Sequence, residues 1–343
     1  MGHMKMRTIR FLELTGFGWL VPAVRLASGE QPRRQIERLL GSVGLPMLAI
    51  AAFLMVWAAA ASQVQTSLGT LPGPAQVWEQ GRQLVIEHRQ QRAKEAAFYE
   101  RQRQRNAERL AQDPDAKVVI RKYTGKPTFF DQILTSLVTV FTGFLLASMI
   151  AIPAGIACGL SPRLYSAISP LIQIFKPVSP LAWLPIVTMV VSAVYVSSDP
   201  MFAKSYITSA ITVMLCSLWP TLINTTLGVS SVDPDLVNVG RVLRLHWWTR
   251  VTKIAVPSAI PMIFAGLRIS LGIGWMVLIA AEMLAQNPGL GKFVWDEFQN
   301  GSSDSLGRIM VAVLTIGLVG YALDWLMLTL QTLVSHERER PAR

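Results

Sequence analysis

Several absences limit what this 343-residue sequence can do. Charged residues make up only 15% of it, against 51% hydrophobic residues, which is too apolar a composition for a soluble protein of this length. Its two cysteines, Cys158 and Cys216, both lie in apolar stretches, a placement that argues against a disulfide framework or a cysteine metal site. The phosphate-loop pattern G-x-x-x-x-G-K-[ST] is missing. The first expectation is therefore a membrane protein that does not itself bind ATP through such a loop.

Histidine is also scarce, at four residues. None of the four lies inside an apolar stretch beside a serine or cysteine; they are His3, His88, His246 and His336. A membrane hydrolase needs a nucleophile and a base close together, so this class is disfavoured. The net charge of +11 raises the question of nucleic acid, but lysine and arginine gather between apolar stretches and form no basic, aromatic patch, so no nucleic-acid partner is expected.

Six apolar stretches are long enough, wholly or nearly, to cross a bilayer as helices, which takes about 20 residues. They cover 43–62, 133–160, 172–196, 206–229, 259–285 and 309–334, and prolines interrupt the third. Before them, residues 7–28 mix apolar residues with Arg10, Glu13 and Arg25, which favours a helix lying in the membrane interface. A seventh span there is the alternative, opposed by Glu13 and Pro22.

Arginine and lysine in the short loops predict the orientation, because such residues gather on the cytoplasmic side. They precede the first span and also lie between the fourth and fifth, as Arg25, Arg33, Arg34, Arg38, Arg241, Arg244, Arg250 and Lys253. Six spans then place both termini in the cytoplasm. The segments expected are a cytoplasmic region with the interfacial helix at 1–42, the first span at 43–62, an external insertion at 63–131, a permease core at 132–334 containing a loop at 230–257, and a cytoplasmic tail at 335–343.

The external insertion is rich in charges of both signs, and residues 75–112 contain no proline, which favours a solvated helix. Arg101, Arg105 and Arg109 recur every four residues and so share one face. Charge runs usually form solvated faces. The alternatives are a docking surface for an external partner and a field that gathers anions.

The cytoplasmic loop between the fourth and fifth spans contains a short amphipathic segment. Asp233 and Pro234 predict a helix start, and Pro257 is expected to open the next membrane helix. A short helix at this place can be gripped by a soluble partner. The loop resembles the cytoplasmic pattern E-A-A-x3-G-x9-I-x-L-P of the inner-membrane permeases of binding-protein-dependent ABC importers, with Asn238 in place of its acid and Arg244 in place of its glycine. The other pattern positions fall on Val239, Gly240, Ile254, Val256 and Pro257.

Other stretches resemble the nitrate, sulfonate and bicarbonate branch of that family, and nitrate-type permeases most. They are LPGP at 71–74, KPVSPLAWLP at 176–185, GLR at 266–268, AAEML at 280–284, PGLG at 288–291 and WD at 295–296. The resemblance implies an all-α membrane protein with a type I ABC importer permease fold, six transmembrane helices and a cytoplasmic coupling helix.

The resemblance also implies a complex in a bacterial inner membrane. Two permease copies, a homodimer, would work with two cytoplasmic ATPase subunits, which bind ATP and Mg, and with an external solute-binding protein. The cargo implied is a small inorganic anion, nitrate first, with bicarbonate, nitrite, cyanate and an organic sulfonate such as taurine as alternatives. A proton-driven secondary transporter is disfavoured because no inverted repeats or paired broken helices are evident.

By the same resemblance, coupling to the ATPase is expected from Leu236, Val237, Asn238, Gly240, Arg241, Leu243, Arg244 and Pro257. The simpler reading is that these arginines only anchor the loop to lipid phosphates.

The third span is the candidate wall of the translocation pathway. Pro177, Pro180 and Pro185 remove backbone donors, and an irregular backbone at membrane depth is tolerated only where protein or a water-filled cavity surrounds it. The pathway candidates are Lys176, Ser179, Pro180, Trp183 and Arg268. The alternative for Lys176 is that it extends to the interface or pairs with an acid, and the alternative for Arg268 is that it extends to the interface. Glu282 and Asp324 are expected to have a structural partner inside the bundle.

Small residues recur every four positions along the second span, at Gly143, Ala147, Ala151, Gly155 and Gly159. They predict close helix packing, within the subunit or across a dimer interface.

Overall fold

A computed structural model of the chain describes residues 21–29, 31–66, 69–113, 118–196, 201–302 and 304–336, together with Ile9 and Gly18. Helices dominate this part, which also contains one hairpin of the short strands β1 (Gln65–Thr66) and β2 (Gly69–Thr70). The predicted all-α architecture is confirmed. The interfacial helix expected at 7–28 is seen only at its end, as α2 (Val21–Ala27), and most of it lies outside the described residues.

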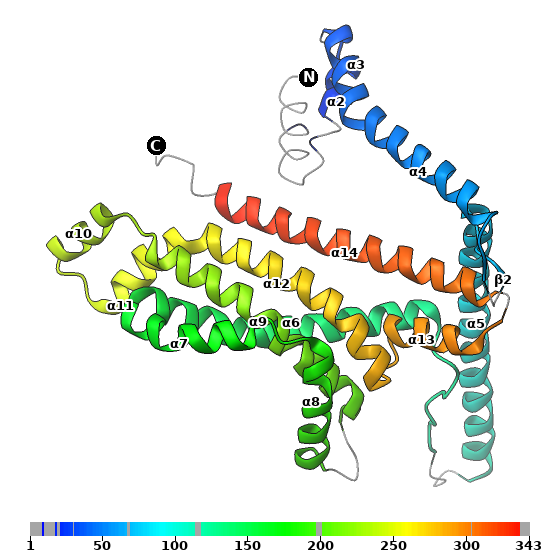
Figure 1. The fold of residues 1–343 in the computed structure, drawn as a ribbon. Coiled ribbons are helices and arrows are strands. Elements are labelled where there is room, and N and C mark those ends of the chain that lie inside the picture. The colour runs from blue at the N-terminus through cyan, green and yellow to red at the C-terminus, as the bar shows by residue number, and fades with distance from the viewer. Residues whose placement is uncertain are drawn as a thin grey trace.

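Four long helices form the core: α6 (Phe129–Leu160), α9 (Lys204–Ser230), α12 (Val256–Ala285) and α14 (Ser305–His336). They run side by side, and α9 packs against both α6 and α12 (Figure 1). Val140, Val213 and Leu278 are fully buried where these helices meet. Each helix is apolar over most of its length, so the buried stripe supplies the packing and the remaining faces suit a lipid or protein environment.

The small residues of α6 face α9. A methyl group on Gly155 would stand 2.6 Å from Cβ of Thr225 and 2.8 Å from the carbonyl oxygen of Leu222. Gly143 and Gly159 meet α9 as closely. The stripe predicted from the sequence therefore serves packing within the subunit, where it lets two helix backbones approach each other.

The first span is longer than its apolar stretch. Helix α3 (Pro32–Leu39), a wider π turn (Leu40–Gly44) and α4 (Leu45–Ala61) form one continuous 30-residue helix. It begins ahead of the predicted boundary at 43 because polar helix formers precede the apolar residues. Its apolar part is unburied in this chain and stands apart from the core (Figure 1).

The third span is two helices. Helix α7 (Pro162–Phe175) and α8 (Pro180–Val194) are bent by 99°, so the described residues contain five candidate membrane helices, or six if this pair counts as one broken span. The break falls at 176–179, next to Pro177 and Pro180, as the missing backbone donors predict. Pro185, also expected to break the helix, lies inside α8 without ending it.

Further helices lie at the two ends of the core (Figure 1). Across one end lie α5 (Pro74–Gln112), which matches the helix predicted at 75–112, and α13 (Leu290–Asn300), which was not predicted. At the other end lie α10 (Pro234–Val242) and α11 (Trp247–Arg250). Pro257 does not open a separate span: α11, a π turn (Val251–Ala255) and α12 are continuous from Trp247 to Ala285.

Candidate coupling loop and translocation pathway

Helix α10 begins where the sequence predicts. The Asp233 side chain accepts a hydrogen bond from the backbone N–H of Asp235 at 2.8 Å, and Pro234 occupies the first turn, where its missing N–H costs nothing. The helix is only nine residues long, too short to be stable alone. Its position therefore depends on contacts with the membrane helix that follows.

Gly240 provides that contact. It is the buried residue of α10, and a methyl group there would lie 2.9 Å from Cδ1 of Ile254 and 3.6 Å from Cδ of Arg250. Ile254 belongs to the π turn that continues into α12. Helix α10 is thus in direct contact with the start of a membrane helix.

Arg244 has an unusual backbone, with φ at 47°, in the left-handed region. The chain turns here after α10, with the N–H of Arg244 bonded to the carbonyl of Arg241 and that of Leu245 to the carbonyl of Gly240, both at 3.0 Å. A non-glycine residue in this region costs about 1 kcal/mol. The family pattern has glycine at this position, and the geometry gives the physical reason.

The outward face of the loop is apolar with a cationic margin. Val242 is 81% exposed and Leu243 63%, and Leu236 and Val239 are exposed as well. Asn238, Arg241 and Arg244 are exposed beside them, whereas Val237 is half-buried. Contiguous exposed apolar side chains with charges around them are typical of a protein contact surface.

The break between α7 and α8 gathers aromatic rings. Phe175 stacks on Trp219 with ring centroids 6.3 Å apart and lies 5.8 Å from the ring of Trp183. The indole nitrogens of Trp183 and Trp219 are buried and have no hydrogen-bond partner among the described residues. Lys176 is exposed at the end of α7, and Ser179 caps α8 by accepting from the N–H of Leu181 at 3.3 Å, with Pro180 in the first turn.

Arg268 does not stand free at membrane depth. Its guanidinium donates twice to the Asp324 carboxylate of α14, Nε to Oδ1 at 2.5 Å and the terminal nitrogen to Oδ2 at 2.7 Å. The side chains remain 39% and 46% exposed, so the pair faces outward from this chain. Charges at this depth are tolerated where protein or water covers them, which points this face of α12 and α14 away from bulk lipid.

The structure also reveals the hydrogen-bond partners of a buried carboxylate, which residue spacing alone did not locate. Glu282 is fully buried, and Ser136 of α6 donates to its two oxygens at 2.9 and 2.8 Å. The backbone N–H of Gly291 donates to it at 2.9 Å. A methyl group on Gly289 would collide with the Glu282 carboxylate, and one on Gly291 would collide with the carbonyl oxygen of Ile279, which explains both glycines of the PGLG stretch. The expectation that Glu282 and Asp324 have structural partners is thus met by the geometry of both.

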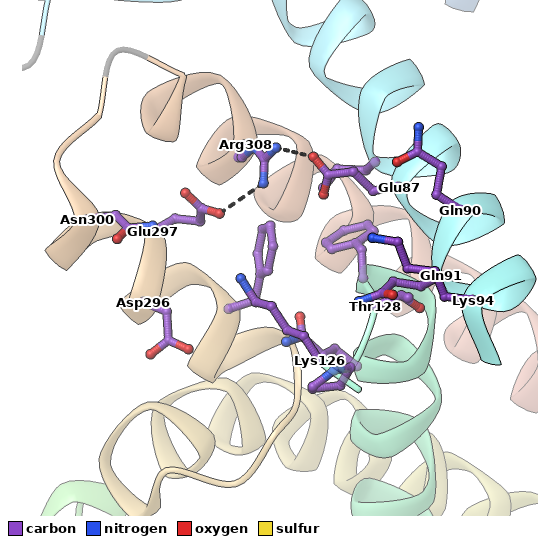
Figure 2. Close-up of a pocket in the computed structure, with 15 residues that line it drawn as sticks. Glu87, Gln90, Gln91, Lys94, Lys126, Thr128, Asp296, Glu297, Asn300 and Arg308 are labelled. Atoms are coloured by element: carbon purple, nitrogen blue, oxygen red, sulfur yellow. Dashed lines mark hydrogen bonds and ion pairs between the residues drawn. The ribbon is translucent and has the colours of Figure 1, made fainter. Parts of the chain in front are cut away.

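A second feature missed from the sequence is the attachment of α5. Arg308 of α14 forms ion pairs with Glu87 of α5 and Glu297 of α13, beside a pocket that Lys94 and Lys126 also line (Figure 2). Arg308 lies 221 positions from Glu87 and 11 from Glu297, and no periodicity in the sequence links the three residues. The only sequence signal is an arginine in the first turn of the last span.

Comparisons with known proteins agree with this architecture. The family described as "Binding-protein-dependent transport system inner membrane component" matches residues 151–336. The chain is 38% identical over 204 residues to the nitrate import permease protein NrtB of Synechococcus elongatus, covering 60% of this chain and 69% of the relative. It is 31% identical over 295 residues to the bicarbonate transport system permease protein CmpB of the same species, covering 85% and 89%.

A solved structure of the MetNI methionine ABC transporter in an inward-facing conformation shares the fold, with a TM-score of 0.52, 13% identity, and coverage of 60% of this chain and 95% of that one. The family match spans more than half of the chain and includes α9, the whole loop around α10, and α12. The chain therefore belongs to the family of binding-protein-dependent transport system inner membrane components, as a multi-pass permease subunit of an ABC importer.

Proposed function

We propose that this permease imports a small inorganic anion, nitrate, and that a separate cytoplasmic ATPase drives it by gripping α10. The observation that carries the proposal is the geometry of the loop together with the similarity of the chain to relatives named for nitrate import. In this proposal the ATPase binds ATP and Mg, and its groove receives the exposed residues Leu236, Asn238, Arg241, Leu243 and Arg244. Gly240 and the half-buried Val237 take part from the other side, where Gly240 lets α10 pack closely against Ile254. The continuous helix through Pro257 carries the motion into the membrane.

The pathway proposed runs past the break between α7 and α8. Lys176, Ser179, Pro180, Trp183 and Arg268 contribute to it. The buried indole N–H groups of Trp183 and Trp219 are hydrogen-bond donors without acceptors among the described residues. A passing anion supplies such acceptors, since a buried donor is costly to leave unsatisfied.

Bicarbonate is the second candidate, because CmpB matches most of the chain. The two anions are flat, singly charged and similar in size, but bicarbonate carries an O–H group and nitrate only accepts hydrogen bonds. A site that offers only hydrogen-bond donors, as the two indole N–H groups do, favours nitrate over bicarbonate. Nitrite, cyanate and taurine follow as further alternatives.

The assembly proposed contains two copies of this chain, two ATPase subunits and an external solute-binding protein. Both termini lie in the cytoplasm, α10 and α11 face the ATPase, and α5 and α13 lie outside the inner membrane. The arrangement of these elements at opposite ends of the core supports this orientation (Figure 1).

The test uses the purified permease–ATPase complex in nanodiscs. We expect ATPase stimulation by binding protein loaded with nitrate, and weaker or no stimulation by the same protein loaded with bicarbonate, nitrite, cyanate or taurine. Stimulation by bicarbonate alone would reassign the cargo. For the loop, Arg241→Asp should abolish copurification of the ATPase, while the matched external change Arg103→Asp should not; an ATPase that stays bound to Arg241→Asp contradicts the coupling role.

A further inference from the structure

The second half of α5, around residues 98–109, carries a groove lined by three arginines. Arg105 and Arg109 come from the helix and Arg121 from the segment that returns along it, and Phe98 and Val119 also line the groove. Arg105 and Arg109 are one helical turn apart, so their side chains lie on one face. The groove is therefore a concentration of positive charge beside an apolar surface.

The returning segment is held in place by specific bonds. The Gln102 side chain, 9% exposed, donates to the carbonyl of Arg121 and accepts from its N–H, both at 3.0 Å. Tyr123 donates its backbone N–H to the Tyr99 hydroxyl at 3.2 Å. These contacts fix the position of Arg121 against the helix, so the grouping of the three arginines is built by the fold.

None of the three guanidinium groups has an ion pair among the described residues, whereas Arg82, Arg92 and Arg308 of the same region each pair with an acid. Arg105 makes only a long bond, 3.4 Å, to the carbonyl of Arg101 in its own helix. Like charges held together repel, and an anionic ligand removes that repulsion. Arginine is well suited to the task, because its planar fork binds carboxylates with two parallel hydrogen bonds.

The position of the groove indicates the kind of ligand. Helix α5 is attached to the core through Glu87 and through an ion pair between Arg92 and Asp131 of α6. The helix continues for about 25 Å beyond Arg92 to Arg109, at about 1.5 Å per residue, and passes the edge of the core (Figure 1). A free anion bound so far from the membrane helices gains no access to them, whereas a large external protein can span the distance.

We propose that this groove is a docking site for an acidic segment of the external solute-binding protein. The identity of that partner rests on the function proposed above, and the family description itself makes such a protein part of the system. The site contributes attraction and orientation: carboxylates of the partner enter among Arg105, Arg109 and Arg121 while apolar atoms cover Phe98. Attraction of this kind raises the association rate and weakens with salt.

The experiment measures binding of nitrate-loaded solute-binding protein to the permease–ATPase complex in nanodiscs of neutral phosphatidylcholine, at about 50 mM and about 500 mM salt. The groove variant reverses the charge of the groove through the three substitutions Arg105→Glu, Arg109→Glu and Arg121→Glu. The control makes the same charge change on α5 away from the face of the groove, with Arg82→Glu, Arg89→Glu and Arg103→Glu. We expect the groove variant to raise Kd about tenfold or more at low salt, mainly because association is slower. The control should change Kd by less than about threefold.

Equal effects of the two variants, or no effect of either while the wild type binds, would overturn the docking site and leave the proposed function standing. A wild-type complex that no binding protein stimulates would overturn both. Two further measurements separate other ligands: loss of direct nitrate binding in the groove variant would assign the groove to the free anion, and loss of adhesion to phosphatidylglycerol vesicles alone would assign it to lipid. Retained ATPase activity of the variant complex shows that it is assembled.

Discussion

Polar side chains at membrane depth fall into two groups. Arg268 and Glu282 have their hydrogen bonds satisfied, by Asp324 and by Ser136 with Gly291 respectively. The indoles of Trp183 and Trp219 keep buried N–H groups with no acceptor in the described part of the chain. Satisfied groups stabilise the fold, whereas groups left open are where a ligand gains hydrogen bonds. The two tryptophans are therefore the more informative pathway candidates.

Trp183→Phe tests this directly. The variant keeps a six-membered aromatic ring beside Phe175 and loses the N–H together with the five-membered ring of the indole, so the complex should still assemble. Loss of a hydrogen bond to an anion, about 1.5 kcal/mol, should slow nitrate uptake by reconstituted complex about tenfold. As a control, Trp275→Phe removes an indole bond to the carbonyl of Ile316 and should lower thermal stability. Unchanged uptake with Trp183→Phe would remove this residue from the pathway.

At Arg244 we predict a substitution that makes the protein more stable. Arg244→Gly relieves a left-handed backbone and should raise the stability of the turn by about 1 kcal/mol, seen as slower hydrogen exchange in α10. If the guanidinium also grips the ATPase, affinity for the ATPase should fall as the turn becomes more stable. Loss of protection in α10 would show that the arginine side chain, and not the backbone shape, maintains this turn.

Among the helices, α6 and α9 are matched by shape. The small residues of α6 bring two backbones together, and carbonyl oxygens of α9 occupy the space that larger side chains would need. Packing of this kind is the main source of stability between helices in a bilayer, where burial of apolar surface gives little.

Gly155→Ala measures the closeness of that contact. The added methyl group meets the Leu222 carbonyl oxygen at 2.8 Å, which is backbone and cannot move aside, so we expect a loss of about 1–3 kcal/mol in unfolding free energy. Gly317→Ala in α14 is the matched control, because nothing lies within 4 Å of the new methyl group and alanine favours the helix. A thermal unfolding assay in detergent should rank Gly317→Ala at or above wild type. Equal stability of the two variants would contradict the close packing.

In the whole molecule, the core helices join two separate groups of elements (Figure 1). α5 and α13 lie at one end and α10 and α11 at the other (Figure 1). This arrangement requires that α7 and α8 together cross the membrane once, despite their 99° bend, so that α9 returns toward the loop around α10. A re-entrant α7–α8 pair would instead place that loop on the same side as α5.

Single cysteines decide between these topologies. Gln112→Cys, Phe202→Cys and Val242→Cys place thiols after α5, between α8 and α9, and on α10, all at exposed residues. The native Cys158 and Cys216 lie inside the core helices and set the background. A membrane-impermeant thiol reagent applied to intact cells should label the first two variants and leave Val242→Cys unlabelled until the membrane is opened. Labelling of Val242→Cys in intact cells would contradict the proposed orientation.

The features that depend on composition and on local residue patterns could be predicted from the sequence alone. The apolar stretches, the proline break at 176–179, the start of α10 at Asp233 and the helix at 75–112 depend on residues near one another in the chain, and hydropathy, missing N–H groups and capping act locally. The family resemblance rested on the same local stretches.

Contacts between distant residues were decided by the tertiary structure alone. The bonds of Glu282 to Ser136, of Arg268 to Asp324, and of Arg308 to Glu87 join residues 56 to 221 positions apart. The same holds for whether the glycines of α6 pack within the chain, and for the placement of Arg121 beside Arg105. A sequence shows which side chains are able to pair, but partner choice depends on the helix packing that brings their atoms within a few ångströms.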